Sequence, residues 1–279
     1  MYFRYIQSKK MSVITLTSDY GNKDYFISSI KGYIHTNLKL ISIIDISHNI
    51  TPFHLGECAY ILRNSYPYFP EKTIHIIGLD SEFHGEKKHI ITKVDNQYFI
   101  GTDSGLFSLI FQNKKIEKII QIEFKQEIKD STFPMINVFA KIACEMINGK
   151  EIEEFGKETS SFLYNKESKP IIKIDEIKQT RTVVAEVIYI DRFGNAITNI
   201  SKDFFDTNIG NKSFTILLRR NQKIELISKK YSDVPEGNIL AIFNSAKLLE
   251  ISIMRRNTSE IGANSLLGIK EKDSILIDF

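Results

Sequence analysis

Three aspartates follow short apolar runs in the first third of the chain, at positions where carboxylates can bind a small ligand. Asp19, Asp45 and Asp80 each stand at or near the end of a run rich in β-branched residues. An ionised aspartate can accept both hydroxyls of a ribose diol. No glycine-rich phosphate loop accompanies Asp19, so the sequence favours a nucleoside over a nucleotide. The alternative is that Asp19 caps the following helix and Asp24 is a solvated first-turn charge.

The segments that carry these aspartates alternate between strand and helix patterns. We predict strands at 13–18, 40–46 and 72–79, and helices at 25–36 and from Thr51-Pro52 onward. Parallel strands joined by right-handed crossovers place their carboxyl ends along one edge of a sheet. The three aspartates are therefore expected to face one crevice of an α/β domain with a largely parallel sheet.

The remainder of the N-terminal half continues this mixed pattern. We predict a hairpin around Asp95-Asn96, a helix at 106–111, a strand at 119–122 and a helix at 137–147. Residues 1–10 precede a second methionine and are treated as a possible extension outside the fold. The α/β N-terminal domain is placed at 11–160.

From residue 171 the sequence becomes rich in short β segments separated by turns, which indicates a small antiparallel barrel or sandwich. The polar, Ser- and Lys-rich stretch before it predicts a linker at 161–169. The C-terminal domain is placed at 170–279. Its expected strands are 182–189, 196–200, 213–218, 223–227, 239–244, 248–254 and 274–279.

Bulk properties exclude several classes of partner. The formal charge is +3, with 37 Lys and Arg against 34 Asp and Glu, and no dense basic run indicates nucleic-acid binding. No apolar run reaches the length of a membrane span, and the N-terminus lacks the features of a signal peptide. Cys58 and Cys144 are far apart, lie in apolar helical patterns and predict buried free thiols in a reducing compartment, so we expect a cytoplasmic protein.

Several polar strings in order along the chain resemble the S-adenosylmethionine hydroxide adenosyltransferase family, which also contains the S-adenosylmethionine-dependent fluorinase and chlorinase. The most specific is D-R-F-G-N-A-I-T-N at 191–199. The resemblance implies an α/β domain followed by a β-barrel, a homotrimer, and ligand sites between subunits. The other strings are 17–24, 44–48, 51–53, 68–70, 102–105 and 244–245.

The resemblance assigns ligand-binding roles to residues of the N-terminal half. Asp19 matches a position that binds the ribose hydroxyls, and Asp24 matches one near the methionine moiety. Phe53 matches an aromatic position near the ligand, where a ring face could attract the sulfonium.

Five residues of the C-terminal half are matched in the same way. Asp191 and Asn195 match positions that hold the amino acid part and the ribose, and Phe193 matches one that packs against the adenine. Tyr231 matches an aromatic position that stacks on the base, and Ser245 one that contacts the amino acid end. Without the resemblance, residues 193–195 could be a simple hairpin turn and Tyr231 an aromatic at the rim of the barrel.

The family reaction is a substitution at the ribose C5′, in which methionine leaves and water or halide attacks from the opposite side. In the hydrolases an Asp, an Arg and a His hold the water. Here the Asp is Asp80, the Arg position is Lys87, and the His of the family string T-F-H-G-R-D is replaced by Pro134. Lysine lacks the planar fork of arginine donors, and proline can neither accept nor donate a proton.

These departures leave alternatives of different classes. The protein is either a hydrolase in which Asp80 and Lys87 position water, with His84 as a candidate substitute, or a non-catalytic binder of S-adenosylmethionine or adenosine. A halogenase is disfavoured because Asp80 would repel a halide.

A metal-dependent hydrolase using Asp19, Asp45, His48 and Asp80 is a further alternative. Asp45 and His48 belong to the D-I-x-H string of the family, so a structural role is preferred for them. We expect neither a metal nor a cofactor.

Overall fold

The computed structural model describes residues 12–82, 87–124, 131–177, 179–255 and 262–279. The chain divides into two compact units, one extending to Lys166 and the other starting at Glu167. Each unit is described by itself. The possible extension at 1–10 and the candidate His84 lie outside the described residues.

The first unit is built on a seven-stranded sheet with the order β2-β1-β3-β5-β4-β6-β7. The pairs β1/β2, β1/β3 and β3/β5 are parallel, and the pairs from β5/β4 to β6/β7 are antiparallel. The predicted largely parallel α/β architecture is thus confirmed. The strands are β1 Ser12–Ser18, β2 Ile41–Ser47, β3 Ile74–Gly78, β4 His89–Val94, β5 Gln97–Thr102, β6 Lys118–Ile122 and β7 Gly156–Glu158.

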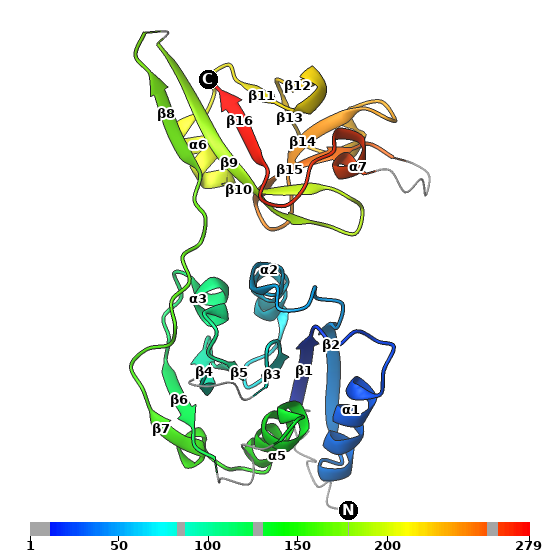
Figure 1. Ribbon diagram of the computed structural model, residues 1–279, viewed down its shortest axis with the longest axis vertical. Helices are drawn as coiled ribbons and strands as arrows, with labels where there is room; N and C mark the ends of the chain where they lie inside the picture. Colours follow the sequence, from blue (N-terminus) through cyan, green and yellow to red (C-terminus); the bar gives the residue numbers. More distant parts are fainter. Residues whose placement is uncertain (1–11, 83–86, 125–130, 178, 256–261) are drawn as a thin grey trace, which may run out of the picture. The chain divides into compact units, whose positions relative to one another are not determined.

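Helices cover both faces of this sheet, because side chains that alternate along the buried strands need apolar cover on each side (Figure 1). One core contains Ile14 and Ile76 with the apolar stripe of α1 (Phe26–Asn37), the π-helix η2 (Met135–Ala140) and α5 (Lys141–Ile147). The other contains Ile77 and Leu79 with α2 (Leu55–Ser65) and α3 (Leu106–Phe111). Short 3₁₀ turns are η1 Tyr66–Tyr68 and η3 Ile152–Phe155.

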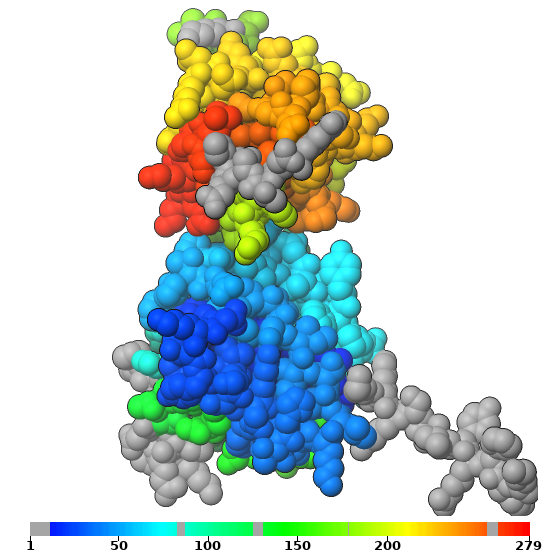
Figure 2. Space-filling view, turned by 90° about the vertical axis from the view of Figure 1, so that its right-hand side faces the viewer, coloured from blue at the N-terminus to red at the C-terminus, as the bar shows by residue number. Residues whose placement is uncertain are grey.

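Strand β2 is the edge of the sheet, next to the strand that carries Asp19 at its end. Figure 2 views the first unit from this side, where the N-terminal segments in blue form most of the visible surface. The hairpin prediction is also confirmed, since Asp95 and Asn96 connect β4 to β5 with φ of 51° and 58°, as a type I′ turn requires.

Two helix starts differ from the prediction. Helix α2 begins at Leu55 rather than at Thr51-Pro52, because the His54 ring accepts a hydrogen bond from the Glu57 N–H and caps the first turn. The helix expected from residue 137 begins at Met135 as a π-helix preceded by Pro134. Proline fits there since the first N–H groups of a helix have no partner within it.

The second unit is mostly β, and its strands form a nearly closed, barrel-like sheet, which confirms the predicted class. The order is β12-β11-β16-β9-β10-β15-β14-β13, with β8 paired to the outer part of the long strand β9. The strands are β8 Ile171–Asp175, β9 Thr180–Ile190, β10 Ala196–Ser201, β11 Thr215–Leu217, β12 Lys223–Ile224, β13 Ile227–Ser228, β14 Ile239–Phe243, β15 Leu248–Ile253 and β16 Ser274–Asp278.

The predicted strand at 223–227 is wrong in one respect, because β12 pairs with β11 whereas β13 pairs with β14. Two short helices, α6 Lys202–Asn208 and α7 Ala263–Leu267, were not predicted; Ser201 caps the first of them through the Phe204 N–H. The 3₁₀ turns are η4 Arg219–Asn221 and η5 Tyr231–Asp233.

Within the part of the chain that the structure describes, no helix is long and apolar enough to cross a membrane. Both cysteines are buried free thiols. Burial raises the pKa of Cys144 to about 11 and that of Cys58 further still, so both thiols are protonated at neutral pH.

Candidate functional site

The elbow after β1 carries Asp19, and the chain after β2 reaches back to it. The Asp19 Oδ2 atom accepts a hydrogen bond from the Phe53 N–H at 3.0 Å. Phe53 has a φ of 63°, a strained value for a non-glycine residue, and its ring is 70% exposed. Asp19 therefore fixes the backbone of Phe53 rather than capping α1, where Tyr25 is the N-cap residue and provides no side-chain cap.

The Asp19 carboxylate is partly buried beside a second carboxylate. Burial is the main cause that raises the pKa of Asp19, and the negative charge of Asp80 raises it further, while the hydrogen bond from Phe53 opposes both. Asp19 and Asp80 are thus close enough for their charges to interact. Both follow the carboxyl ends of neighbouring strands, β1 and β3, as predicted from the strand order.

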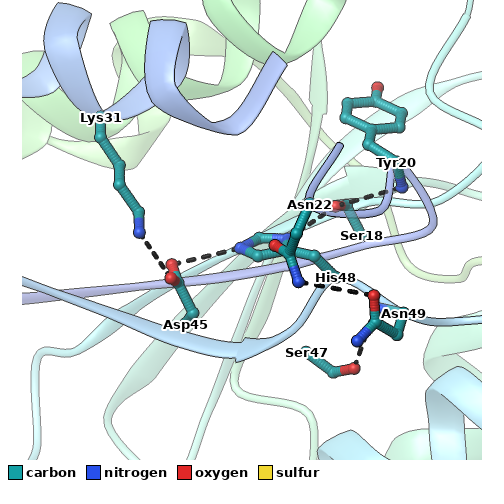
Figure 3. A network of polar contacts seen from close by, with 8 residues as sticks. All are labelled: Ser18, Tyr20, Asn22, Lys31, Asp45, Ser47, His48 and Asn49. Carbon is teal, nitrogen blue, oxygen red and sulfur yellow. Dashed lines mark hydrogen bonds and ion pairs between the residues drawn. The ribbon is translucent and has the colours of Figure 1, made fainter. Parts of the chain in front are cut away.

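Asp45 does not point into the same place. Its carboxylate contacts Lys31 of α1 at 2.5 Å and the Nε2 atom of His48 at 3.2 Å (Figure 3). The other ring nitrogen of His48, Nδ1, lies 2.7 Å from the Oγ atom of Ser18. Desolvation tends to raise the pKa of Asp45, but the hydrogen bonds from Lys31 and His48 outweigh it and lower the pKa. The predicted crevice of three aspartates is therefore corrected to two.

The loop after β3 holds the pair predicted to handle water. Lys87 and Asp80 form an ion pair, and Asp80 has a φ of 50°, a second strained position at the same sheet edge. Their side chains are 37% and 17% exposed, respectively, so water can reach the pair.

Ser81, directly after Asp80, connects the loop after β3 to the elbow after β1. Its hydroxyl group lies 2.6 Å from that of Tyr20. Desolvation raises the pKa of Tyr20 to about 12, so its hydroxyl stays protonated and can donate. Tyr20 and Ser81 were not among the predicted site residues, because a hydroxyl pair 61 positions apart leaves no signal in the sequence.

The segment that lacks the family histidine closes one side of this region with apolar groups. Phe133 packs against Tyr20 and Phe26 with ring centroids 5.9 and 5.5 Å apart. Met135 is fully buried against Gly78 of β3, where its Sδ atom lies 2.7 Å from the position of an added Cβ. Pro134 thus stands where an imidazole was expected, and the next residue, Met135, adds a buried thioether.

A different histidine lies close to this loop. His89, at the start of β4, is 1% exposed and packs edge-on against Phe139 and Phe124. Burial lowers its pKa to about 4, which a hydrogen bond with the Ser81 backbone and the charge of Asp80 only partly oppose. The imidazole is therefore neutral at physiological pH. His89 was not among the predicted site residues, because no motif around it indicates a function.

In the second unit, Asp191 closes the turn between β9 and β10. Its Oδ1 atom accepts hydrogen bonds from the N–H groups of Phe193 and Asn195, and its Oδ2 atom accepts one from the Asn195 amide at 2.8 Å. Gly194 has a φ of 74° and packs against Gly262, so a side chain at either position would collide with the other backbone. The hairpin-turn interpretation is correct for the backbone, and the turn leaves the Phe193 ring 68% exposed.

A buried polar cluster connects the matched residues of this unit. Glu250, which is 3% exposed, accepts hydrogen bonds from the Tyr231 hydroxyl at 2.9 Å and the Asn244 amide at 3.2 Å. Ser252 donates to Asn195 and lies 3.3 Å from Glu250. Burial raises the pKa of Glu250, and Asp191 adds to the effect. Glu250 and Ser252 were not among the predicted site residues. Both lie on β15, and the residue pattern of that strand does not reveal that an inward-facing carboxylate has hydrogen-bonding partners.

The predicted site residues therefore form two groups, one in each unit. Asp19, Phe53, Asp80 and Lys87 meet at one sheet edge of the first, while Asp24 is exposed just before α1. The second group consists of Asp191, Phe193, Asn195 and Tyr231, together with Ser245, which is exposed in the turn after β14. Among the described residues, no group of three or more metal-binding side chains occurs.

The class defined by these features is a two-unit protein with an α/β sheet edge bearing paired carboxylates and a barrel-like unit with a polar cluster. The N-terminal domain model of the S-adenosylmethionine hydroxide adenosyltransferase family matches residues 14–156, and the C-terminal domain model matches residues 185–276. The chain belongs to this family.

Named relatives and solved structures match nearly the whole chain. An (R)-S-adenosyl-L-methionine hydrolase of Methanocaldococcus jannaschii is 33% identical, over 92% of this chain and 94% of the relative. A protein of the same name from Thermus thermophilus is 24% identical, over 94% and 97%. The crystal structure of an uncharacterized conserved protein from Thermotoga maritima superimposes with a TM-score of 0.79 at 27% identity, covering 95% of this chain and 99% of that one.

Proposed function

We propose that this protein binds S-adenosylmethionine and hydrolyses it to adenosine and L-methionine. Family membership and the hydrolase names of its relatives support the substrate and the reaction. The single observation that carries the proposal is the Asp80–Lys87 ion pair beside Asp19, at the sheet edge where parallel strands end.

The reaction is written with water as the nucleophile. The water oxygen attacks the ribose C5′ as the C5′–S bond breaks. The electron pair of the broken C5′–S bond stays on sulfur, so methionine leaves as a neutral thioether. The water also loses one proton, and the Asp80 carboxylate is proposed to accept it. Because the sulfonium is already an activated leaving group, the protein mainly has to align the water.

The proposed roles follow from chemistry at each atom. Lys87 orients Asp80 as a point charge, and Asp19 accepts the ribose hydroxyls with the lone pairs that Phe53 leaves free. The exposed Phe53 ring offers a face to the sulfonium.

In the second unit, the exposed Phe193 ring and Tyr231 are proposed to contact the adenine, and Asp191, Asn195 and Ser245 the ribose and the amino acid part. Asp24 is proposed to contact the methionine end. A halide nucleophile is disfavoured because the charge of Asp80 would repel it.

We also propose that the chain assembles as a homotrimer with ligand sites between subunits, acts in the cytoplasm and uses no metal or cofactor. Light scattering of the purified protein should give three times the chain mass of 32.2 kDa. Activity should be unchanged after dialysis against a chelator, and a loss restored by a divalent cation would contradict the metal-free proposal.

The direct test combines adenosine release with a calorimetric titration of S-adenosylmethionine. Binding with release supports the hydrolase. Binding without release would identify a non-catalytic binder and reject turnover. Neither binding nor release at millimolar ligand would reject the proposal entirely.

A further inference from the structure

We infer that His48 is a positioning residue that holds Asp19 in place for the nucleoside, acting through Ser18 and Gly21 without touching the ligand. The inference rests on the proposed function, because it concerns the same site. It assigns a functional task to a buried histidine that the proposed reaction does not itself use.

The first step is that His48 holds the chain on both sides of Asp19. Its Nδ1 atom lies 2.7 Å from the Ser18 Oγ, one residue before Asp19, and its carbonyl oxygen accepts the Gly21 N–H at 2.7 Å, two residues after. The elbow between β1 and α1 is therefore fixed at two points by one residue from the end of β2. The position of the Asp19 carboxylate depends on both contacts.

The second step concerns the tautomer of His48, which the contact with Asp45 favours. An oxygen of the Asp45 carboxylate lies 3.2 Å from Nε2, and an ionised carboxylate favours the tautomer with the proton on Nε2 and with Nδ1 as the acceptor (Figure 3). Ser18 then donates its hydroxyl proton to Nδ1. The Ser18 oxygen remains free to accept the Tyr20 N–H at 3.4 Å.

The third step concerns what orients Asp45. Lys31, on α1, contacts the Asp45 carboxylate at 2.5 Å. The network therefore joins α1, β2 and the end of β1, which are the three elements that meet at the elbow. A carboxylate behind an imidazole is a known way to fix the tautomer and the orientation of the ring.

Burial separates this positioning role from nucleophilic catalysis. A serine, a histidine and an aspartate in contact could form a nucleophile and its base. Ser18 is 0% exposed and His48 is 3% exposed, so neither side chain can reach a substrate carbon. The neighbouring Asp19, by contrast, is partly exposed and is the group proposed to contact the ligand.

The test uses two replacements that each keep one half of the imidazole. In His48→Asn the side-chain oxygen can occupy the Nδ1 position and still accept from Ser18. In His48→Gln the longer amide can reach Asp45 but leaves no acceptor at the Nδ1 position. His35→Gln, at an exposed position in the last turn of α1, is the matched control.

Adenosine and S-adenosylmethionine are titrated into each variant, and melting temperature, KM and kcat are measured. We expect His48→Asn to stay within about threefold of the parent affinity and His48→Gln to weaken binding about tenfold or more, which corresponds to one lost hydrogen bond of about 1.4 kcal/mol. The KM should rise in parallel while kcat changes less. Ser18→Ala should resemble His48→Gln.

Two results would overturn the inference, and a third would reject the proposed function as well. Parent-like affinity in a folded His48→Gln variant would show that the contact does not position Asp19. Equal loss of affinity and of melting temperature in both His48 variants would reduce the residue to a general structural role. If the parent protein binds neither ligand, the proposed function fails first and the inference falls with it.

Discussion

At the scale of single residues, two of the positions with strained backbone lie beside the proposed chemistry. Phe53 and Asp80 both have positive φ without being glycine. Strain of this kind costs about 1–3 kcal/mol and persists only where the surroundings hold it, as the Asp19 carboxylate does for the Phe53 N–H. Asp19 therefore has two tasks, one toward the backbone and one toward the ligand.

Replacing Asp19 by alanine should weaken S-adenosylmethionine binding about a hundredfold, because two ribose donors lose a charged acceptor. The measurement is a calorimetric titration, with Glu71→Ala as the control at the opposite end of the sheet. Unchanged affinity in Asp19→Ala would place the ligand elsewhere.

Lys87→Ala should lower kcat about tenfold to a hundredfold with a smaller change in KM, because the cation orients Asp80 in the transition state rather than binding the ligand. Lys87→Arg should keep most of the activity, since it preserves the charge and adds donors. The rate of adenosine release measures both. A Lys87→Ala variant with parent-like kcat would remove Lys87 from the mechanism.

At the scale of elements, the site is built where strand ends meet the π-helix η2, which begins directly after Pro134. The Met135 thioether fills the space beside Gly78, and Pro134 begins the helix. A π-helix start of this kind adds apolar cover to the end of β3, only two residues before Asp80. This contact explains why a glycine is tolerated inside a fully buried strand.

Gly78→Ala should destabilise the protein by about 1–3 kcal/mol, because the new Cβ would overlap the Met135 side chain. Met135→Ala alone should also destabilise it through a cavity. The double variant should lose less than the sum of the two, because the cavity accommodates the new methyl group. Urea unfolding measures all three, and strict additivity would contradict the packing argument.

The order of elements and the strand ends could be predicted from periodicity, because Ile-rich runs and turn residues determine secondary structure through contacts between residues that are close in sequence. The hairpin at Asp95-Asn96 and the strand that delivers Asp80 are examples. The Tyr20–Ser81 contact, the His89 environment and the Glu250 cluster could not be predicted, because each joins residues far apart in sequence and depends on which side of a strand faces inward. The prediction that the Asp45 side chain points into the shared crevice was wrong for the same reason.

At the scale of the whole molecule, buried histidines make stability depend on pH. The pKa values of His75 and His89 are lowered to about 4 by burial, so the unfolded chain binds more protons than the folded one between about pH 4 and 6.5. Stability is therefore present above the unfolded pKa and is lost as pH falls through this window. Buried carboxylates with raised pKa, such as Glu250, act in the opposite direction.

The contribution of a single histidine can be separated by its slope. The unfolding free energy of the parent should fall with decreasing pH more steeply than that of His89→Gln, by a total of up to about 3 kcal/mol between pH 6.5 and 4. Urea titrations at several pH values measure both slopes. Identical slopes would show that His89 titrates normally in the folded protein.

The central claim is that water attacks the ribose C5′ of S-adenosylmethionine in this protein. The most direct measurement is mass spectrometry of the nucleoside formed in water labelled with ¹⁸O. We predict adenosine that carries one labelled oxygen at C5′, together with unlabelled methionine. Unlabelled adenosine, or no adenosine from a protein that binds the ligand, would contradict the claim.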